Sequence, residues 1–280
     1  YHLDPSKCPY LQRISVDCCP LTSLDVSKNL NLRVLNIEDS GITSIDLTNN
    51  TKLTQLYASH NSGSLNTTAK ITSIDLSKNT ELTYLTLSGN RLTEIDLSNN
   101  SKLGNLYLAG NLLTHIDVSN LTNLVNFDIK NNYFTFATLP DPDPAWYDFQ
   151  YEQHPIALDK SYAEGTELNL ADKVIRPGTT TTCELYAYST ASNTSTKLDA
   201  TYYDYADGKV TLKKASSDSL YLSFANSAFV GVPLATKRFM VKKADEFGKP
   251  SEIIKFGTIV GDGTQINMSA GLLGASETTP

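Results

Sequence analysis

The chain has 280 residues, 40% of them hydrophobic, and a formal net charge of −7 from 30 acidic and 23 basic residues. This length allows one or two domains that each bury their own core. No uninterrupted apolar run approaches the roughly 18 residues of a membrane span, so we expect no membrane insertion. The acidic charge, with no basic stripe beside it, argues against nucleic acid as a partner.

Residues 1–10 fit no repeat and precede the first one, so we predict that they cap the N-terminal end. The chain starts at Tyr1, and we expect that an export signal has been removed. Cys8, Cys18 and Cys19 cluster in this region. Two arrangements are open: a disulfide from Cys8 to Cys18 or Cys19, or a reduced and buried trio.

A pattern with a period of 21 residues then organises the chain up to about residue 138. Repeats begin at Leu11, Leu32, Leu53, Leu82, Leu103 and Leu124. The interval from Leu53 to Leu82 is longer by eight residues, which we assign to a loop at 62–70. A period of this length with L-x-x-L-x-L-x-x-N-x-L is typical of leucine-rich repeats and predicts a solenoid of about six turns.

Each repeat position has a predicted role. The first, fourth and sixth residues point inward from a short parallel strand, as Leu53, Leu56 and Ala58 do. The ninth forms a ladder of buried amides that satisfies backbone groups of adjoining turns; its members are Asn61, Asn90, Asn111 and Asn132. An I-D-L motif at the fourteenth to sixteenth positions predicts a second short strand. Roughly eleven residues between the strands leave no space for a helix on the convex side.

The aspartates of the I-D-L motif form a column. Its members are Asp25, Asp46, Asp75, Asp96 and Asp117. Carboxylates about 4.8 Å apart on stacked turns could share calcium ions. We favour the other interpretation, in which each aspartate points outward and forms a turn with the Ser or Thr that follows two residues later.

After the last repeat, Tyr133, Phe134 and Phe136 are predicted to seal the open end of the core. Residues 139–154 are rich in proline and aromatic side chains, and we interpret them as a stiff linker whose aromatics are packed. From 155 to 250, short runs of alternating apolar and polar residues are separated by turn signals such as PGTT and DG. These runs predict an antiparallel β-sandwich of about seven strands. Residues 251–280 contain one more strand-like run, or form a tail.

No catalytic motif is present. The histidines have no metal-ligand spacing, and there is no H-E-x-x-H, G-x-S-x-G or Walker sequence. Cys183 lies within a predicted strand and has no evident catalytic partner. We therefore expect no enzymatic activity, no cofactor and no metal.

The third and fifth repeat positions face the concave sheet, and they supply the candidate ligand-binding residues: Gln55, Tyr57, Tyr84, Asn105, Tyr107, Asn126 and Asp128. The three tyrosines lie on adjoining turns in a diagonal patch. Tyrosine combines a rigid apolar face with a polar tip and is enriched at interfaces. Tyrosine also has high strand propensity, so the patch could simply cover the sheet. The other candidate sites are the 62–70 loop and the joint between the domains.

The repeat LTEIDLSNNSKLGNLYLAGN at 92–111 resembles the 21-residue leucine-rich repeats of bacterial surface and secreted proteins, notably those of Bacteroidetes. The segments FTFATLP, YDFQYEQHP and TTTTCELYAY resemble the immunoglobulin-like module that follows such repeats, with Cys183 where that module often has Trp. The resemblance implies an exported bacterial protein, located outside the cell or on its surface, that binds through the repeats.

We therefore predict a mainly β protein with a leucine-rich repeat domain (1–138), a linker (139–154) and an immunoglobulin-like sandwich (155–250). The predicted function is adhesion or interaction with a protein partner, such as a host protein, through the concave face. Two alternatives stay open: a carbohydrate-binding surface protein, or a structural spacer with no specific ligand.

Overall fold

The structure is a computed structural model that describes residues 3–59 and 70–243. Within these ranges the chain is mainly β, with sixteen strands and one helix of four residues. It forms two compact units. Unit 1 comprises the described residues of Tyr1–Ile156 with Leu170–Cys183 and Ser223–Thr236, and unit 2 comprises Ala157–Asn169, Glu184–Leu222 and the described residues from Lys237 onward.

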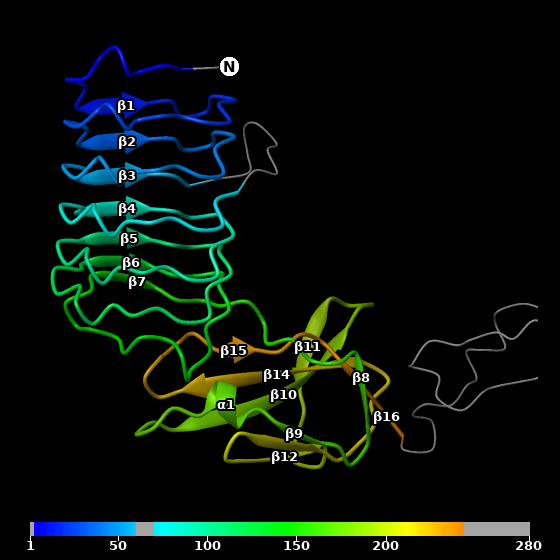
Figure 1. Cartoon of the computed structure of the whole chain (residues 1–280). Helices are drawn as coiled ribbons and strands as arrows, with labels where there is room; N and C mark the ends of the chain where they lie inside the picture. Colours follow the sequence, from blue (N-terminus) through cyan, green and yellow to red (C-terminus); the bar gives the residue numbers. More distant parts are fainter. Residues whose placement is uncertain (1–2, 60–69, 244–280) are drawn as a thin grey trace, which may run out of the picture. The chain divides into compact units, whose positions relative to one another are not determined.

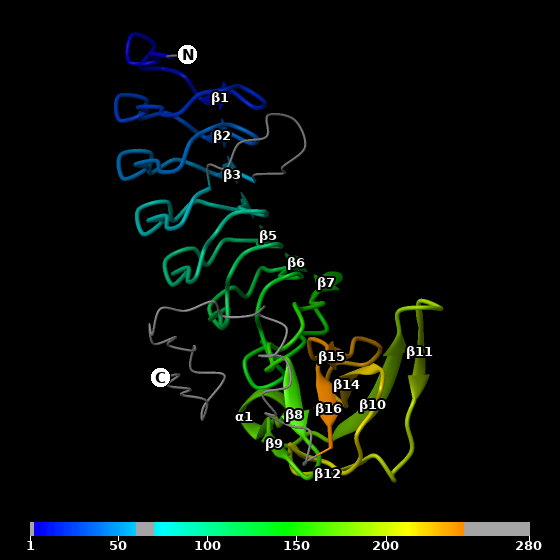
Figure 2. The same cartoon turned by 90° about the vertical axis from the view of Figure 1, so that its right-hand side faces the viewer.

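Unit 1 contains a solenoid of about six turns, in which each turn adds one short strand to a parallel sheet (Figures 1 and 2). The strands are β1 (Arg13–Ser15), β2 (Val34–Asn36), β3 (Gln55–Tyr57), β4 (Tyr84–Thr86), β5 (Asn105–Tyr107), β6 (Asn126–Asp128) and β7 (Asp148–Gln150). Equivalent repeat positions pair from β1 to β6, so that Leu35 lies beside Leu56 and Leu56 beside Leu85. The eight extra residues before β4 do not shift this register.

The core of the solenoid consists of the first, fourth and sixth repeat positions, as predicted. Leu53, Leu56 and Ala58 are each 0% exposed, and so are their equivalents Leu103 and Leu106. A leucine at these positions is buried against the turns above and below, and each fully buried side chain contributes about 1.5–3 kcal/mol.

The predicted asparagine ladder is confirmed at Asn90, Asn111 and Asn132. The Nδ2 of Asn111 donates to the carbonyl oxygens of Leu87 (3.0 Å) and Leu108 (2.9 Å), and its Oδ1 accepts from the backbone N–H of Leu92 (3.1 Å). One amide therefore joins two turns and pairs three of their backbone groups.

A second asparagine ladder, not predicted from the sequence, runs through the turn after the I-D-L motif. Its members are Asn29, Asn50, Asn79 and Asn100, all 0% exposed. The Nδ2 of Asn50 donates to the carbonyl oxygens of Val26 and Asn29 in the preceding turn, each at 3.1 Å. The recurring S/T-x-N of the repeat was the available signal, since a buried asparagine needs such partners.

The second short strand predicted at the I-D-L motif is wrong: in the described turns these residues belong to no strand. The physical reason lies in the aspartates. Asp25 Oδ1 accepts the backbone N–H of Ser27 at 2.8 Å, and Asp96 Oδ1 accepts that of Ser98 at 2.9 Å. A side chain that binds the local backbone in this way replaces the bonds a strand would make to its neighbour.

The parallel sheet continues into the segment interpreted as a linker. Strand β7 pairs with β6, with Phe127 beside Phe149 and Asp128 beside Gln150. The Phe149 ring stacks on that of Phe127 with centroids 5.4 Å apart, and the Trp146 ring meets Phe127 edge-on at 5.0 Å. These aromatic contacts extend the core by one strand beyond the last leucine-rich turn.

The other aromatic residues of this region divide into buried and exposed ones. Phe134 and Phe136 are buried, as expected for residues that seal the core, whereas Tyr133 is 44% exposed and packs against His154. Tyr147 is 89% exposed, so the expectation that every aromatic of 139–154 is packed is wrong for this residue.

The remaining strands form three small sheets in the described ranges, with orders β11-β10-β14-β15, β12-β13-β9 and β16-β8. They are β8 (Ser161–Ala163), β9 (Glu167–Asn169), β10 (Thr181–Ser189), β11 (Thr194–Lys197), β12 (Tyr203–Ala206), β13 (Lys209–Leu212), β14 (Ser219–Asn226), β15 (Leu234–Ala235) and β16 (Met240–Lys242), with helix α1 (Ala171–Val174). Figure 2 shows β10 and β11 as an antiparallel hairpin. The predicted DG turn joins β12 and β13, where Asp207 and Gly208 have φ of 49° and 77°.

Some sequence-based expectations concern residues outside the described ranges. These are the ladder residue Asn61, nearly all of the 62–70 loop, and the extra strand or tail at 251–280.

Candidate functional site

The candidate site is one face of the parallel sheet, which we call the sheet face. It consists of the third, fifth and seventh positions of each turn, because side chains alternate along a strand and the fourth and sixth point into the core. In β3, β5 and β6 the middle residue is buried and its two neighbours are partly exposed. All seven predicted ligand-binding residues lie on this face, on four adjacent strands.

A row of three tyrosines occupies the centre of the sheet face. The rings of Tyr57 and Tyr84 are stacked with centroids 4.8 Å apart, and those of Tyr84 and Tyr107 are tilted with centroids 5.6 Å apart. Tyr84 thus has a ring on each side. Stacked aromatic side chains hold one another in place, so the row is preorganised.

The hydroxyl groups of this row are nearly free of protein partners. Tyr57 donates a long hydrogen bond to Gln55 Oε1 (3.3 Å). The hydroxyls of Tyr84 and Tyr107 make no hydrogen bond to any described residue. Burial is the main cause that raises the pKa of both tyrosines, and neighbouring tyrosine rings add to it for Tyr84 and the carboxylate of Asp148 for Tyr107. Both therefore stay neutral hydroxyl groups at physiological pH.

At the C-terminal end of the row the predicted residues form polar pairs. Asn126 Nδ2 donates to Asn105 Oδ1 at 2.6 Å. Asp128 Oδ1 accepts the backbone N–H of Lys130 at 3.0 Å, and the Lys130 ammonium lies 3.4 Å from Asp128 Oδ2. Burial nevertheless outweighs these contacts and raises the pKa of Asp128.

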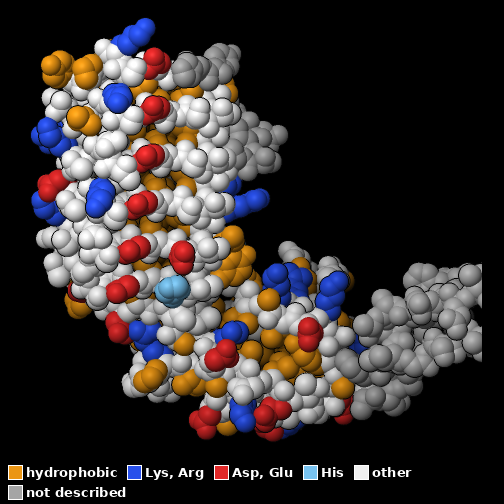
Figure 3. All heavy atoms as spheres, in the orientation of Figure 1, with side chains coloured by type: hydrophobic (Ala, Val, Ile, Leu, Met, Phe, Trp, Pro, Cys, Tyr) orange, Lys and Arg blue, Asp and Glu red, His pale blue; other side chains and the backbone are white. Residues whose placement is uncertain are grey.

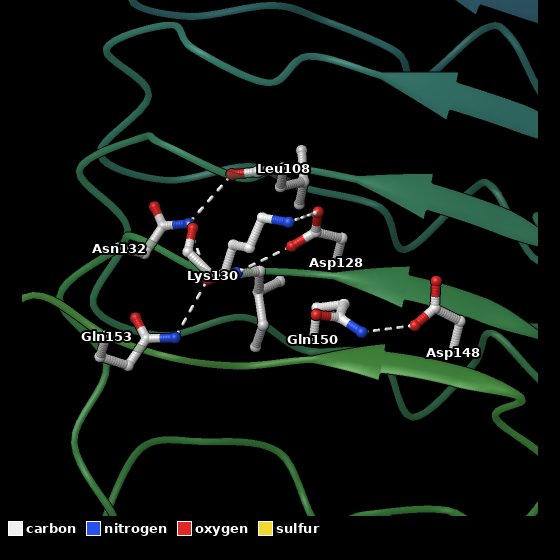
Figure 4. A network of polar contacts seen from close by, with 8 residues as sticks. Leu108, Asp128, Lys130, Asn132, Asp148, Gln150 and Gln153 are labelled. Carbon is white, nitrogen blue, oxygen red and sulfur yellow. Dashed lines mark hydrogen bonds and ion pairs between the residues drawn. The ribbon is translucent and has the colours of Figure 1, made fainter. Parts of the chain in front are cut away.

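Strand β7 adds two residues to this end that the sequence analysis missed. Figure 4 shows Asp148 and Gln150 beside Asp128 on the neighbouring strand, with Gln150 Nε2 donating to Asp148 Oδ1 at 2.6 Å. They were missed because β7 does not carry the leucine pattern. The alternation D-F-Q around an aromatic was its only local signal.

Carboxylates also border the N-terminal end. Glu38, at the seventh position of the β2 turn, is half-buried, and this burial raises its pKa although the Ser59 side chain binds it. Glu38 also lies near Asp17 and Asp39, whose charges raise the pKa further. The tyrosine row is thus bordered by acidic side chains at both ends.

The column of aspartates forms a separate acidic feature, visible as a row of acidic side chains along the solenoid in Figure 3. Each Oδ1 accepts the backbone N–H two residues later, as at Asp46 (2.9 Å), where the Thr48 hydroxyl also donates (2.6 Å). These hydrogen bonds lower the pKa of all five aspartates. In the described residues, no three His, Cys, Asp or Glu side chains gather as they would around a metal ion. The turn interpretation therefore explains the column.

The cysteines of the N-terminal region are free and exposed. Cys8, Cys18 and Cys19 have no disulfide partner, and none of the three is buried, so the buried trio is wrong. Cys18, the eighth residue of its repeat, has a positive φ of 53° in the turn that follows β1.

No protein-family model and no curated protein matches the sequence. Among solved structures, the chain is similar to the functional domain of InlJ from Listeria monocytogenes, with a TM-score of 0.62 and 23% identity over 86% of this chain and 50% of that one. That structure includes a cysteine ladder, whereas the ladders here are built of asparagine. This chain therefore spans half of the InlJ chain.

Two further structures align more loosely. A leucine-rich repeat protein of Leptospira interrogans, LIC12759, matches 55% of this chain and 41% of its own, with 19% identity and a TM-score of 0.46. A chain of the Drosophila Toll–Spatzle complex matches 54% of this chain and 35% of its own, with 15% identity and a TM-score of 0.24.

The fold is therefore that of a leucine-rich repeat solenoid. This conclusion rests on the 21-residue turns, the parallel sheet, the asparagine ladder and the likeness to the Listeria structure. The described residues contain no helix that is long and apolar enough to cross a membrane.

Proposed function

We propose that the chain is a non-enzymatic interaction module that binds a protein partner through the sheet face of its repeats. The single observation that carries the proposal is the tyrosine row, whose rings are held by one another while two hydroxyls have no described partner. Rigid tyrosines at the centre of a surface supply much of the binding energy in many protein interfaces. Stacked-turn solenoids present extended surfaces of this kind for binding.

The geometry favours a protein over a carbohydrate. A tyrosine binds a sugar by offering the open face of its ring. The ring of Tyr84 has a tyrosine ring on each side, with centroids 4.8 and 5.6 Å away. The faces of this ring are therefore largely covered, and a partner would contact its hydroxyl edge. Hydroxyl edges beside the amides of Asn105 and Asn126 suit the mixed polar contacts of a protein interface.

The rest of the architecture is part of the proposal. We place an immunoglobulin-like β-sandwich after the repeats, with boundaries at 1–138, 139–154 and 155–250, supported by the antiparallel pairs β10–β11 and β12–β13.

The resemblance of the repeats to those of bacterial surface and secreted proteins supports an extracellular or cell-surface location. Protease treatment of intact producing cells, followed by immunoblotting, tests this location, and protection of the protein until the cells are lysed would contradict it.

The binding proposal is tested with a double substitution, Tyr84→Ser with Tyr107→Ser. We expect it to weaken binding by more than about 2 kcal/mol, roughly 30-fold in Kd, because it removes the centre of the row. The measurement is biolayer interferometry against an array of purified extracellular proteins, with a glycan array run in parallel.

Tyr10→Ser is the matched control, because Tyr10 is 84% exposed and lies outside the sheet face. A protein hit that the double variant loses and the control keeps supports the proposal. A hit that survives the double substitution places the binding site elsewhere. Hits on glycans alone favour the carbohydrate-binding alternative. A lower unfolding temperature of the double variant, measured by circular dichroism, means that the tyrosines are structural.

A further inference from the structure

The distribution of charged residues on the sheet face indicates the chemistry of its partner. The central turns, which carry the tyrosine row, have no charged residue at the third, fifth and seventh positions. The charged residues of the face lie at its two ends. The acidic ones are Asp17, Glu38, Asp128, Asp148 and Glu152, and the basic ones are Arg13 and Lys130, which leaves a net charge of −3.

The carboxylates of the sheet face differ in kind from those of the aspartate column. In the column each carboxylate is exposed and bound by its own turn, which lowers its pKa. On the sheet face, burial raises the pKa of Glu38 and Asp128. These carboxylates are thus less solvated than those of the column, and an approaching cation would interact with them more strongly.

The tyrosines complement this arrangement. The hydroxyl oxygens of Tyr84 and Tyr107 accept hydrogen bonds from a donor that carries positive charge, and Tyr107 lies beside Asp128 in the strand register. Guanidinium groups present several N–H donors in one plane, so that one group can donate to a hydroxyl oxygen and to a carboxylate. A tyrosine row with carboxylates at its ends is therefore complementary to arginine and lysine side chains on a protein surface.

We propose that the partner that docks on the sheet face is a basic protein surface, whose arginine and lysine side chains contact the tyrosine hydroxyls and the bordering carboxylates. This inference rests on the proposed function, since it names the chemistry of the partner at the same surface. Electrostatic attraction of this kind speeds association, and added salt weakens it.

The test uses a phage library of random 12-residue peptides selected on the immobilised full chain. Selected peptides are then measured on three variants. The first neutralises the sheet face: Glu38→Gln, Asp128→Asn and Asp148→Asn together. The second is matched in charge and neutralises the column: Asp46→Asn, Asp75→Asn and Asp96→Asn together, since asparagine can also form the turn. The third is Tyr84→Ser with Tyr107→Ser.

We expect the selected peptides to be rich in arginine and lysine. Their affinity should fall about tenfold or more with the neutralised sheet face and less than twofold with the neutralised column. Salt should weaken binding to the unmodified chain more steeply than binding to the sheet-face variant. Both triple variants are expected to stay folded, with unfolding temperatures only slightly different from that of the unmodified chain, because the replacing amides keep the hydrogen-bond acceptors.

Three outcomes would overturn the inference, and they separate it from the proposed function. Peptides that require the tyrosines but lack basic residues, or that ignore the neutralised sheet face, refute the basic partner and leave the sheet-face site standing. An equal loss with both triple variants shows attraction by net charge only. Peptides that bind without needing the tyrosines refute the proposed site itself.

Discussion

Tyrosines occupy outward positions of strands in two regions of this molecule, and their surroundings differ. In the solenoid, Tyr57, Tyr84 and Tyr107 contact one another. In unit 2, the rings of Tyr186 on β10 and Tyr221 on β14 lie nearly parallel, with an interplanar angle of 9° and centroids 5.2 Å apart. Ring packing is therefore similar in both groups, and it does not distinguish them.

The polar ends of the two groups do distinguish them. Tyr186 donates to Glu184 Oε2 at 2.6 Å, and Glu184 in turn pairs with Lys197. Tyr188 donates to Asn193 Oδ1 at 2.5 Å, and the Arg238 guanidinium lies 3.5 Å above its ring. The hydroxyls of Tyr186 and Tyr188 thus have partners close by in unit 2, whereas the hydroxyls of Tyr84 and Tyr107 make no hydrogen bond to a described residue. The two groups therefore differ in the partners of their hydroxyl groups and not in the packing of their rings.

The largest expected effect concerns the scaffold that holds the solenoid row in place. Asn111→Ala removes an amide that satisfies three backbone groups. We expect it to lower the free energy of unfolding of the solenoid by about 3 kcal/mol, because these buried groups lose their partners. Urea denaturation followed by circular dichroism measures this loss.

Asn99→Ala is the control for that substitution, since Asn99 is exposed and makes only a 3.4 Å contact to the hydroxyl of Ser98. The two variants should differ clearly. If both variants were equally stable, the asparagine ladder would not contribute to the stability of the solenoid that carries the tyrosine row.

A smaller effect on stability is expected when a hydroxyl group is removed from each of the two groups of tyrosines. Tyr186→Phe removes a hydrogen bond to a carboxylate at a mostly solvated site, so we expect a loss of about 0.5 kcal/mol in stability. Tyr84→Phe removes a hydroxyl that has no partner among the described residues, so the unfolding temperature of this variant should not fall. If the unfolding temperature fell equally in both variants, the hydroxyls of Tyr84 and Tyr186 would not differ in their contribution to stability.

Ultraviolet titration of the tyrosines checks the same contrast. The hydrogen bond to Glu184 is the main cause that raises the pKa of Tyr186 from 10.0 to about 12. A pKa raised by folding stabilises the native state fully below pH 10 and ceases to do so as pH rises through 12. The absorbance step near pH 12 should be absent from Tyr186→Phe, and its persistence would contradict the assignment.

The smallest effect concerns the carboxylates. The pKa of Asp128 is raised, so this group favours folding only at low pH and opposes it once ionised. The pKa of Asp96 is lowered, so this group supports folding at neutral pH and ceases to do so in acid. At pH 7 we therefore expect Asp128→Asn to unfold at a slightly higher temperature than the unmodified chain, and Asp96→Asn at a slightly lower one.

Calorimetric scans between pH 3 and pH 7 test this pair of substitutions. Both differences should shrink toward pH 3: Asp128 becomes protonated in the folded and the unfolded chain, and the advantage of ionised Asp96 falls as the pH approaches its lowered pKa. If Asp128→Asn lowers the unfolding temperature at pH 7, its pairing with Lys130 outweighs its burial, and the charge argument for the sheet face weakens.

Much of the solenoid could be predicted because the same pattern of buried residues recurs in every repeat. Leucines at the first and fourth positions and asparagine at the ninth recur every 21 residues, so the core, the strand register and one ladder follow from the period. The same alternation places Tyr57, Tyr84 and Tyr107 on the sheet face. The I-D-L motif misled the prediction because its alternation also fits a strand, and only the hydrogen bond from Asp25 Oδ1 to Ser27 shows that the local turn wins.

The sequence by itself therefore determined the mainly β solenoid, its core and the side chains that share one face, because these depend on periodic burial. The tertiary structure alone decided that β7 joins the sheet and brings Gln150 beside Asp128 and Asp148 beside Asn126, since no leucine repeat marks this strand in the sequence. It also decided which tyrosine hydroxyls have no partner among the described residues and which carboxylates are partly buried. That property depends on the positions of groups far apart in the chain, which residue spacing does not encode.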